Sequence, residues 1–494
     1  MAVTVLVVGA GPVGLTMAIE LVRQGVKVRI IDMAAARTDK SKALIIWPRT
    51  LELLSRSGPV DAFISAGLKI TTATIRTGET LIAQTDLTDV DSPFPFALSL
   101  PQSETERLLD QRMKGFGIQV ERQVELLRFA ETEAGVTSIL RHPDGREETV
   151  ESGWLIGCDG AHSAVRHGLG MQFEGDTVQN DFILADVHIA NAPGSPSEIS
   201  IYWHRDGVLL FFPISGGRYR VIADIGASQD PHPHEPALED VQSLLDQRGP
   251  EGIVAADPIW LSAFRINERK VRDYRRGRIF LAGDAAHVHS PAGGQGMNTG
   301  MQDAFNLAWK LALVCQGKAA PGLLDSYSPE RSAVGRKVLA DAGRLTAIAT
   351  LRNPAAQAVR NMIGHLLFGL QPVRHALATQ LSEIAIGYPE SPLNGPHASG
   401  VRGPAPGERI APVRTEPVVD GDRSPKFALF ASPQKPALAL ISAFPDLLES
   451  TPRPPLDEAG IWLARPDGYV AAVAQLPDTA LIADYLSSIR FGAR

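Results

Sequence analysis

The chain has little of what builds a disulfide-stabilised, membrane-spanning or nucleic-acid-binding protein. Its 494 residues include two cysteines, Cys158 and Cys315, too few for a disulfide framework or a cysteine-rich metal site. No apolar run is long enough to cross a bilayer, and a net charge of −7 offers no basic surface for nucleic acid. His287 and His289 are of metal-ligand type, but the sequence signals no third ligand beside them. We therefore expect no metal, no membrane and no nucleic acid.

The remaining composition is typical of a globular protein with more than one domain. Hydrophobic residues make up 44% and charged residues 21%. The length exceeds that of one ordinary domain. The apolar start at Val3–Val8 lacks the basic segment of a signal peptide and runs into a glycine turn, which predicts a strand. We expect a cytoplasmic protein that is a monomer or a homodimer.

An N-terminal βαβ unit carries the pattern of a dinucleotide-binding site. Val3–Val8 leads into Gly9, Gly11 and Gly14 at the start of an expected helix. In this pattern the first glycine permits a tight turn, the second lets the backbone approach a pyrophosphate, and the third permits close helix packing. Asp32 ends the second strand and can accept hydrogen bonds from a ribose. The pattern by itself does not separate FAD from NAD.

A second motif lies far downstream. An apolar strand at 278–282 ends at Gly283 and Asp284, and a turn containing Pro291 precedes a helix-like run that starts near Met301. A carboxylate at the end of a buried strand can hold a hydroxylated chain, while the N–H groups of a new helix N-terminus can face an electron-rich ring. Together the two motifs predict the two halves of one FAD site.

With both motifs in place, the chain resembles the class A flavoprotein monooxygenases, aromatic hydroxylases of the p-hydroxybenzoate and phenol hydroxylase kind. The resemblance covers nearly the whole length and implies that Asp284 bonds the ribityl chain and that Pro291 lines the pocket on the reactive side of the flavin. The cofactor-binding residues that it implies are Gly9, Gly11, Pro12, Val13, Gly14, Asp32, Lys42, Gln102, Val124, Asp159, Asp284, Pro291, Gly294, Gly296, Met297 and Asn298.

Among these residues, Lys42 is a variant side chain, and Val124 and Asp159 have an alternative interpretation. Lys42 stands where many family members place an arginine over the cofactor phosphates. The lysine keeps the positive charge but lacks the planar guanidinium group that can bind a phosphate through two hydrogen bonds. Gln102 aligns near the phosphate and ribityl region. Val124 is either a backbone contact of the adenine or a core valine. Asp159 belongs to an aspartate-glycine motif used for both FAD and the nicotinamide, or it caps a helix.

Strand patterns and the resemblance predict an α/β + β architecture, a Rossmann-like FAD-binding domain with an inserted antiparallel-sheet substrate domain and a C-terminal thioredoxin-like domain. β-rich runs at 199–203, 208–212 and 219–225 are separated by hairpin signals. The expected bounds are 1–174 and 277–387 for the FAD-binding domain, 175–276 for the substrate domain, 388–412 for a Pro/Gly-rich linker and 413–494 for the tail. No cofactor motif follows Asn298, so the tail is expected to be dispensable for flavin binding.

The resemblance further implies that NADPH or NADH reduces the flavin, which reacts with O₂ through a C4a-hydroperoxide and hydroxylates a phenolic or polycyclic aromatic substrate. The substrate-lining candidates are Trp47, Tyr202, Phe211, Phe212 and Arg220. Strand alternation allows only one of Phe211 and Phe212 to face the flavin. No catalytic side chain is identified. Baeyer–Villiger-like insertion, inactivation of an aromatic antibiotic, and a non-catalytic FAD-binding role stay open as alternatives.

Overall fold

The computed structural model describes residues 3–227, 235–412 and 424–491, and its first sheet joins distant parts of the chain. The strand order is β17 (Arg275–Arg276), β18 (Ile279–Leu281), β11 (Glu147–Gly157), β1 (Val3–Val8), β2 (Val28–Asp32) and β8 (Glu121–Arg122). β9 (Glu125–Glu131) and β10 (Val136–Arg141) extend β11 as an antiparallel ribbon. The strands from β18 to β8 are parallel, so the carboxyl ends of β1 and β18, which carry the two motifs, meet at one edge.

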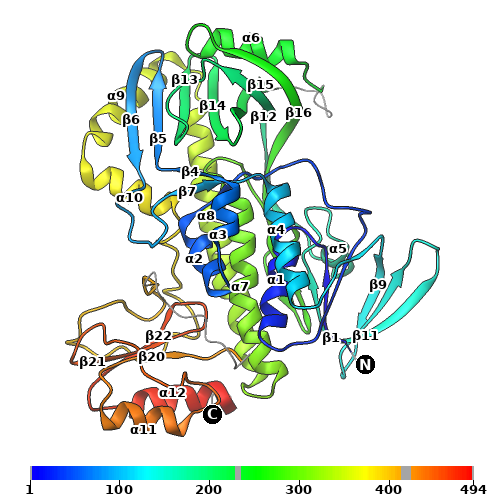
Figure 1. Cartoon of the computed structure of the whole chain (residues 1–494), viewed down its shortest axis with the longest axis vertical. Coiled ribbons are helices and arrows are strands. Elements are labelled where there is room, and N and C mark those ends of the chain that lie inside the picture. The colour runs from blue at the N-terminus through cyan, green and yellow to red at the C-terminus, as the bar shows by residue number, and fades with distance from the viewer. Residues whose placement is uncertain (1–2, 228–234, 413–423, 492–494) are drawn as a thin grey trace.

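The packing of two helices, one after each glycine motif, brings the two motifs close together. α1 (Pro12–Arg23) packs along α7 (Gly296–Cys315), which runs through the middle of the molecule (Figure 1). The side chain of Val13 fits between Gly283 and Gly300, where a Cβ atom added at either glycine would lie 2.7 Å from it. Glycine at both positions therefore lets α1, α7 and the second motif approach each other closely. α2 (Pro48–Arg56), α3 (Asp61–Ala66), α4 (Gln102–Gly115) and α5 (Ala164–Gly168) complete this part.

The second sheet is antiparallel apart from one parallel pair and stands above the first part (Figure 1). Its order is β19 (His287–Val288), β16 (Val254–Lys270), β12 (Glu174–Ala190), β15 (Arg218–Ala227), β14 (Gly207–Ile214), β13 (Glu198–His204), β5 (Thr72–Thr77) and β6 (Thr80–Asp86). The three runs expected from the sequence lie within β13, β14 and β15, joined as hairpins. Three strands of this sheet come from outside 175–276: β5, β6 and β19. β5 joins the sheet through a parallel pairing with β13, and the local sequence pattern does not reveal such a pairing between distant segments. α6 (Leu238–Arg248) covers one face.

The helices expected between 329 and 386 are present. They are α8 (Tyr327–Ala349), α9 (Pro354–Phe368) and α10 (Gln371–Leu381), preceded by the 3-10 helices η1 (Gly283–Ala285) and η2 (Pro321–Ser326). A short sheet of β3 (Ile45–Ile46), β7 (Ala97–Ser99) and β4 (Leu68–Ile70) lies between the two larger ones. Within the described ranges, no helix is long and apolar enough to cross a membrane.

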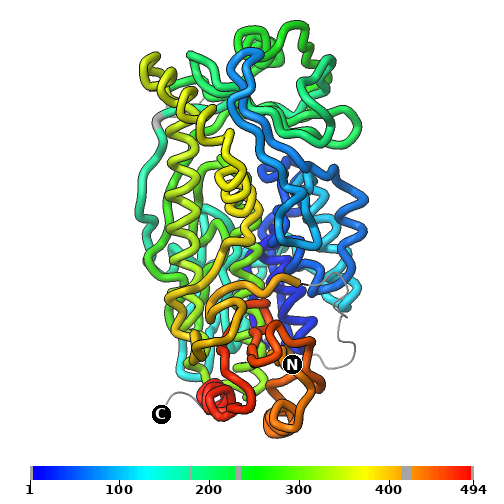
Figure 2. Tube along the Cα trace, turned by 90° about the vertical axis from the view of Figure 1, so that its left-hand side faces the viewer, coloured from blue at the N-terminus to red at the C-terminus, as the bar shows by residue number. Residues whose placement is uncertain are grey.

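The C-terminal part forms its own sheet but shares a core with α7. β20 (Ala428–Phe430), β21 (Gly460–Ala464) and β22 (Val470–Gln475) are antiparallel, with α11 (Lys435–Ala443) and α12 (Ala480–Phe491) beside them at the lower end of the molecule (Figure 2). Trp309 and Leu313 of α7 are buried in one cluster with Phe427 and Leu463 of this part. The tail therefore shares a hydrophobic core with α7, and the expectation that it is dispensable for flavin binding stays a prediction.

The expected linker at 388–412 is also fixed in place. Its backbone pairs with β22, since the N–H of Gly395 donates to the Ala471 carbonyl (2.8 Å) and the N–H of Gly407 donates to that of Val470 (2.9 Å). Its abundant proline and glycine residues build turns along the edge of β22 and not a free tether.

Candidate functional site

The first glycine motif forms an uncapped helix N-terminus. Gly9 has a φ of +97°, and a Cβ atom there would lie 2.4 Å from the Cys158 carbonyl oxygen. A Cβ atom at Gly14 would lie 1.9 Å from the Gly9 oxygen, whereas one at Gly11 would meet nothing within 4 Å. α1 begins at Pro12 with no side-chain cap and no acidic residue in its first turn. Its free N–H groups and the open space at Gly11 suit an anion such as a pyrophosphate.

Asp32 and Val124 lie beside this turn. The Asp32 carboxylate accepts hydrogen bonds from the backbone N–H groups of Ala10 (2.7 Å) and Ala34 (2.8 Å), which fix its orientation. The N–H of Val124 donates to the Asp32 carbonyl oxygen at 3.1 Å, and the Val124 side chain is buried. The Val124 side chain therefore belongs to the hydrophobic core, and a contact of its backbone with adenine stays a prediction.

The second motif presents Asp284 among buried residues. Asp284 lies in η1, and its side chain is exposed although neighbouring residues are buried. Loss of bulk solvent around the carboxylate raises its pKa, while the charges of His287 and Lys42 act in the opposite direction. The charge of Lys42 acts on Asp284, so these two expected cofactor ligands lie within electrostatic reach of each other.

The segment that carries Lys42 is held from two sides. The side-chain oxygen of Gln102 accepts from the N–H of Ala43 (3.0 Å), and the backbone N–H of Gln102 donates to the Ala43 carbonyl (3.0 Å). From the second sheet, buried Arg220 donates to the carbonyl oxygens of Lys42 (2.9 Å) and Ser41 and to both oxygens of Asp186 (2.8 Å each). The Arg220 guanidinium is thus engaged in joining the substrate sheet to the cofactor segment.

Asn298 joins the same segment to the start of α7. Its side-chain oxygen accepts from the N–H of Trp47 (2.9 Å), and its amide donates to the carbonyls of Ile45 (2.8 Å) and Gly294 (3.1 Å). The Trp47 indole donates to the Gly293 carbonyl at 2.9 Å. α7 begins with no side-chain cap and no acidic residue in its first turn, so its N–H groups at Gly296 to Asn298 stay available to an electron-rich ring.

The turn before α7 and Asp159 complete the expected set. Pro291 is exposed at the start of a turn in which the N–H of Gly294 donates to the Pro291 carbonyl (2.8 Å). Asp159 accepts from the Ser163 hydroxyl (2.5 Å) and from the N–H of Val165 (3.2 Å), and burial raises its pKa. These bonds fit the helix-cap interpretation, and a role toward the nicotinamide stays a prediction.

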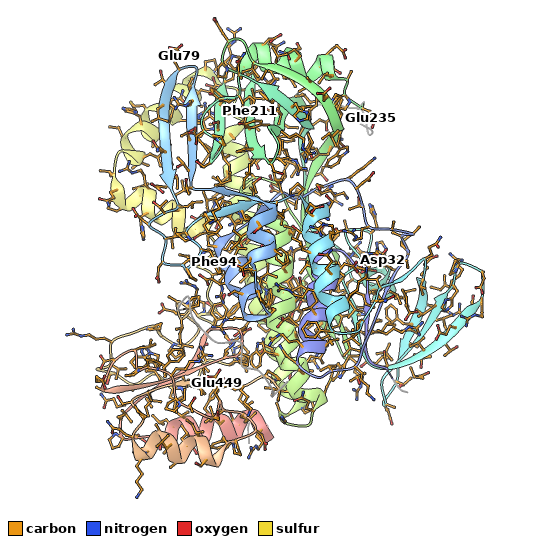
Figure 3. The ribbon with its side chains drawn as sticks, in the orientation of Figure 1. Asp32, Glu79, Phe94, Phe211, Glu235 and Glu449 are labelled. Carbon is orange, nitrogen blue, oxygen red and sulfur yellow. The ribbon has the colours of Figure 1, made fainter. Side chains whose placement is uncertain are left out.

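The second sheet separates the aromatic candidates onto two faces. Tyr202 and Phe211 pack beneath α6, with ring centroids 5.8 Å apart, and Phe211 lies inside the upper sheet, far from Asp32 (Figure 3). Phe212 points to the other face and belongs to the cluster of Trp47. Phe212 is therefore the member of its pair on the cofactor side.

Sequence reasoning missed further aromatic side chains on that face. Phe182 and Phe264 stack with centroids 5.8 Å apart, and Trp260 and Phe264 are only partly buried beside Phe212. They come from β12 and β16, whose length and pairing the sequence does not give. Phe212 packs against the clusters of both Trp47 and Phe182, and the Arg220 guanidinium lies 5.7 Å from the Trp260 ring centroid, so this side of the sheet faces the cofactor segment.

α7 also carries Asp303, which is the centre of a buried ionic network that the sequence interpretation missed. Asp303 accepts from the N–H of Gly283 (2.9 Å) and from Arg331 (2.6 Å), and it lies 2.9 Å from His287 Nε2. Burial alone would raise the pKa of Asp303, but Arg331 and His287 outweigh it and hold the pKa below its usual value. Arg331 also donates to the Thr299 carbonyl (3.0 Å), so one cluster fixes both η1 and the start of α7. The signal for this network in the sequence was Asp303, a charged residue inside an otherwise largely apolar helix.

Glu383 is a second buried carboxyl group next to α7. It is fully buried, and the Gln302 amide donates to its Oε2 at 2.5 Å. Within the described residues, Glu383 Oε1 and Gln302 Oε1 have no hydrogen-bond partner. Burial raises the pKa of Glu383 to about 8, against smaller opposite effects of Gln302 and Arg331. A protonated Glu383 can donate to the Gln302 oxygen and satisfy both groups.

Glu383→Gln is expected to remove part of the pH dependence of stability. The folded state keeps the Glu383 proton above the unfolded pKa of 4.5, so its stabilisation is full below pH 4.5 and is lost as the pH rises toward 8. Relative to the variant, the parent should lose up to about 1.4 kcal/mol per pH unit in that window. Urea unfolding midpoints at pH 5.5 to 8.5 measure this, with exposed Glu79→Gln as the control. Parallel pH profiles of parent and Glu383→Gln would contradict it.

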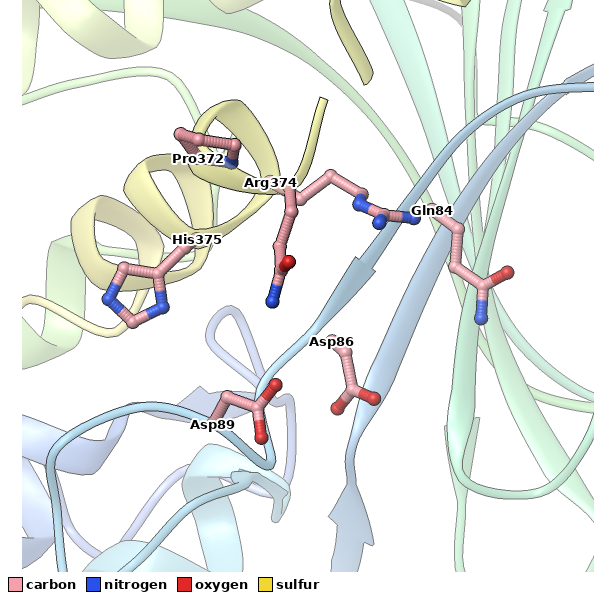
Figure 4. Close-up of a pocket in the computed structure, with 7 residues that line it drawn as sticks. Gln84, Asp86, Asp89, Pro372, Arg374 and His375 are labelled. Atoms are coloured by element: carbon pink, nitrogen blue, oxygen red, sulfur yellow. The ribbon is translucent and has the colours of Figure 1, made fainter. Parts of the chain in front are cut away.

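An open pocket of about 640 Å³ lies elsewhere, between β6 and α10. Its lining is Gln84, Asp86, Asp89, Gln371, Pro372, Arg374 and His375 (Figure 4). Most of these side chains are polar or charged and exposed, and none belongs to the predicted cofactor set. This pocket is separate from the flavin site.

Comparison with known proteins agrees with the geometry. A family model described as an FAD binding domain matches residues 2–342, which include both motifs. The chain belongs to the class A flavin monooxygenases. The predicted FAD-dependent aromatic monooxygenase is confirmed, whereas the assignment of individual site residues stays a prediction.

This monooxygenase resembles enzymes of aromatic polyketide chemistry. It is 39% identical over 414 residues to 6-methylpretetramide 4-monooxygenase of Streptomyces rimosus, with 82% of this chain and 74% of that protein covered. It is 31% identical over 488 residues to a 12-dehydrotetracycline 5-monooxygenase/anhydrotetracycline 6-monooxygenase of the same species, covering 97% of this chain and 91% of that one. The solved OxyS anhydrotetracycline hydroxylase from Streptomyces rimosus matches all of both chains with a TM-score of 0.78 and 28% identity.

Asp284→Ala should weaken FAD retention by the monooxygenase about ten- to hundred-fold, because a hydroxyl of the cofactor would lose a charged acceptor, roughly 1.5–3 kcal/mol. Titration of the apoprotein with FAD, followed by flavin fluorescence, measures the change. Asp89→Ala in the pocket of Figure 4 removes an exposed carboxylate away from the site and is the control. Equal FAD affinity of Asp284→Ala and the parent would remove the ribityl assignment.

Proposed function

We propose that the monooxygenase uses NADPH or NADH and O₂ to hydroxylate a polycyclic phenol of polyketide type. The observation that carries the proposal is that Phe212, Trp260 and Phe264, which are only partly buried, lie on the side of the second sheet that faces the cofactor segment. Several rings along two long strands offer more apolar contact than one phenol ring covers. The names of the relatives, which refer to pretetramide and anhydrotetracycline compounds, support the same substrate class.

In this proposal, bound FAD supplies electron transfer and oxygen activation, and the protein supplies position and electrostatics. The N-terminus of α1 holds the pyrophosphate, Asp284 the ribityl hydroxyls, and the N-terminus of α7 stabilises negative charge on the ring system. Asn298 and Arg220 keep the segment from Ser41 to Trp47 against that site. The apolar face orients the substrate and excludes water.

The rate of NAD(P)H oxidation tests the substrate class. The holoenzyme is mixed with monocyclic phenols and with tricyclic or tetracyclic phenols of matched acidity, and NADPH and NADH are compared. We expect the polycyclic compounds to stimulate oxidation and to yield products heavier by one oxygen atom. Phe212→Ala should raise the KM for them more than it lowers kcat. Stimulation confined to monocyclic phenols, or ring-inserted products, would overturn the proposal.

We also propose a domain division that follows the expected ranges. FAD binding belongs to 1–174 and 277–387, with β5 and β6 added to the substrate unit at 175–276. The tail at 413–494 after 388–412 is proposed to be thioredoxin-like, which the sheet of β20, β21 and β22 and the helices α11 and α12 in its described residues support. Both cysteines are free thiols, which supports a reducing cytoplasm as the compartment.

A further inference from the structure

Helix α9 carries an apolar stripe that faces away from the protein. The exposed residues are Val359 (50%), Met362 (59%), Ile363 (45%), Leu366 (64%), Leu367 (46%) and Leu370 (54%), the last lying just beyond the helix end. They recur at intervals of three and four residues, the spacing of one face of an α-helix. Scattered exposed apolar residues are ordinary, but a continuous stripe of this kind marks an interaction surface.

The stripe is not the face that α9 uses inside its own chain. Gln357, Arg360 and Gly364 are buried and face the second sheet. A Cβ atom at Gly364 would lie 3.0 Å from Ile82 of β6, so this side of α9 sits tightly on the sheet. At 100° per residue, the stripe lies on the opposite side of the helix. α9 therefore packs on the sheet through Gln357, Arg360 and Gly364, and the described residues leave the apolar stripe on its other side uncovered.

The charges around the stripe disfavour a lipid surface. Residues 351–381 contain no aspartate or glutamate, and their arginines are Arg352, Arg360 and Arg374. Arg352 donates to Asp224 (3.1 Å), and Arg360 donates to the Ile348 carbonyl (3.0 Å). Arg374 shares the pocket of Figure 4 with Asp86 and Asp89. An interfacial helix usually presents basic side chains and tryptophan beside its apolar face, and this stripe contains neither.

We propose that a second copy of this chain covers the stripe, with the two α9 helices packed antiparallel about a twofold axis near Leu366. A twofold interface brings the same patch of both copies together, and an uncharged apolar stripe can pack against its own copy without repulsion between like charges. Six half-exposed side chains offer on the order of 500 Å² of apolar surface, so the pair buries roughly 1,000 Å², near the lower limit for a specific interface. The dimer is therefore weak, with a dissociation constant in the micromolar range.

The fold places this interface away from the flavin and the tail. α9 lies at the opposite end of the molecule from β20, β21 and β22 (Figure 2). α9 itself contacts β6 and α10, which carry no residue of the expected cofactor set, so dimerisation leaves the cofactor site of each copy complete. Because both copies carry a net charge of −7 and the contact is apolar, added salt should strengthen the dimer.

Sedimentation equilibrium of the FAD-loaded protein from 1 to 200 µM tests the proposal. The parent should pass from monomer to dimer in this range, and Leu366→Glu should weaken association at least ten-fold while keeping the flavin spectrum and thermal midpoint. The control is Leu438→Glu on α11, which changes an exposed leucine (44%) on another helix and should leave the dimer intact. Oxidised Leu366→Cys should give a disulfide-linked dimer, because both copies of the residue lie near the axis.

Three results would overturn the proposal. The first is a monomer throughout the concentration range. The second is a dimer that Leu366→Glu leaves unchanged. The third is co-sedimentation with phosphatidylcholine/phosphatidylglycerol vesicles that Leu366→Glu abolishes, which would assign the stripe to a membrane surface.

Discussion

Asp303→Ala is expected to destabilise the monooxygenase by about 3–5 kcal/mol and to abolish FAD binding, because it leaves two buried partners uncompensated. Arg331, fully buried, would lose its 2.6 Å carboxylate partner, and His287 would lose its contact at 2.9 Å. The N–H of Gly283 would also lose its acceptor beside Asp284. The unfolding midpoint in urea and the flavin content of the purified protein measure the two effects.

A surface ion pair provides the control for this experiment. Asp325→Ala removes the partner of Arg275, but the Asp325 side chain is 75% exposed, so the expected loss is below about 1 kcal/mol. Asp303→Asn keeps the shape without the charge and should fall between parent and Asp303→Ala. If Asp303→Ala loses no more stability than Asp325→Ala and retains FAD, the buried network does not organise the site.

Arg465→Met is expected to loosen the tail from the rest of the protein, with a loss of about 3–5 kcal/mol. The Arg465 guanidinium contacts both oxygens of Glu330 on α8 (2.6 and 3.0 Å) and also Asp467 (2.6 Å), and these side chains are almost completely buried. Burial alone would raise the pKa of Glu330, but Arg465 and Lys310 outweigh it and hold the pKa far below its usual value. A lower midpoint and faster proteolysis of the tail should follow.

Arg344→Met is the matched control, because the Arg344 side chain is 74% exposed and contacts Asp341 at 3.4 Å. Its expected effect is within about 0.5 kcal/mol. Truncation before Leu393 should act like Arg465→Met but more strongly, since it also uncovers Trp309 on α7. A truncated protein as stable as the parent, with normal FAD content, would show that the shared core adds nothing to the flavin-binding part.

The local elements of the flavin site could be predicted from the sequence because their signals are local. A strand, a glycine turn and a helix follow within the first 23 residues, and β1 and α1 have those bounds. Asp284 and Asn298 were predicted from short motifs at a strand end and a helix start, with their roles implied by the family resemblance. The two motifs lie near each other because β1 and β18 belong to one parallel sheet, in which ligands bind at the carboxyl ends of the strands.

The parts that were not predicted depend on pairing between distant segments. Asp303, His287 and Arg331 come from three elements and show no shared periodicity. The role of Arg220 depends on the approach of β15 to Ser41 and Lys42, and the aromatic face depends on the register of β12 with β16. The pairing of 388–412 with β22 was not predicted, because proline and glycine mark turns whether or not the chain then packs on a strand.

Labelled-oxygen mass spectrometry tests the central claim most directly. The holoenzyme is supplied with NAD(P)H, a substrate that stimulates its oxidation, and ¹⁸O₂ in unlabelled water. We expect FAD to be released on denaturation and the hydroxylated product to carry one ¹⁸O atom. A product whose new oxygen comes from water, or a protein that takes up no FAD on reconstitution, would contradict the account.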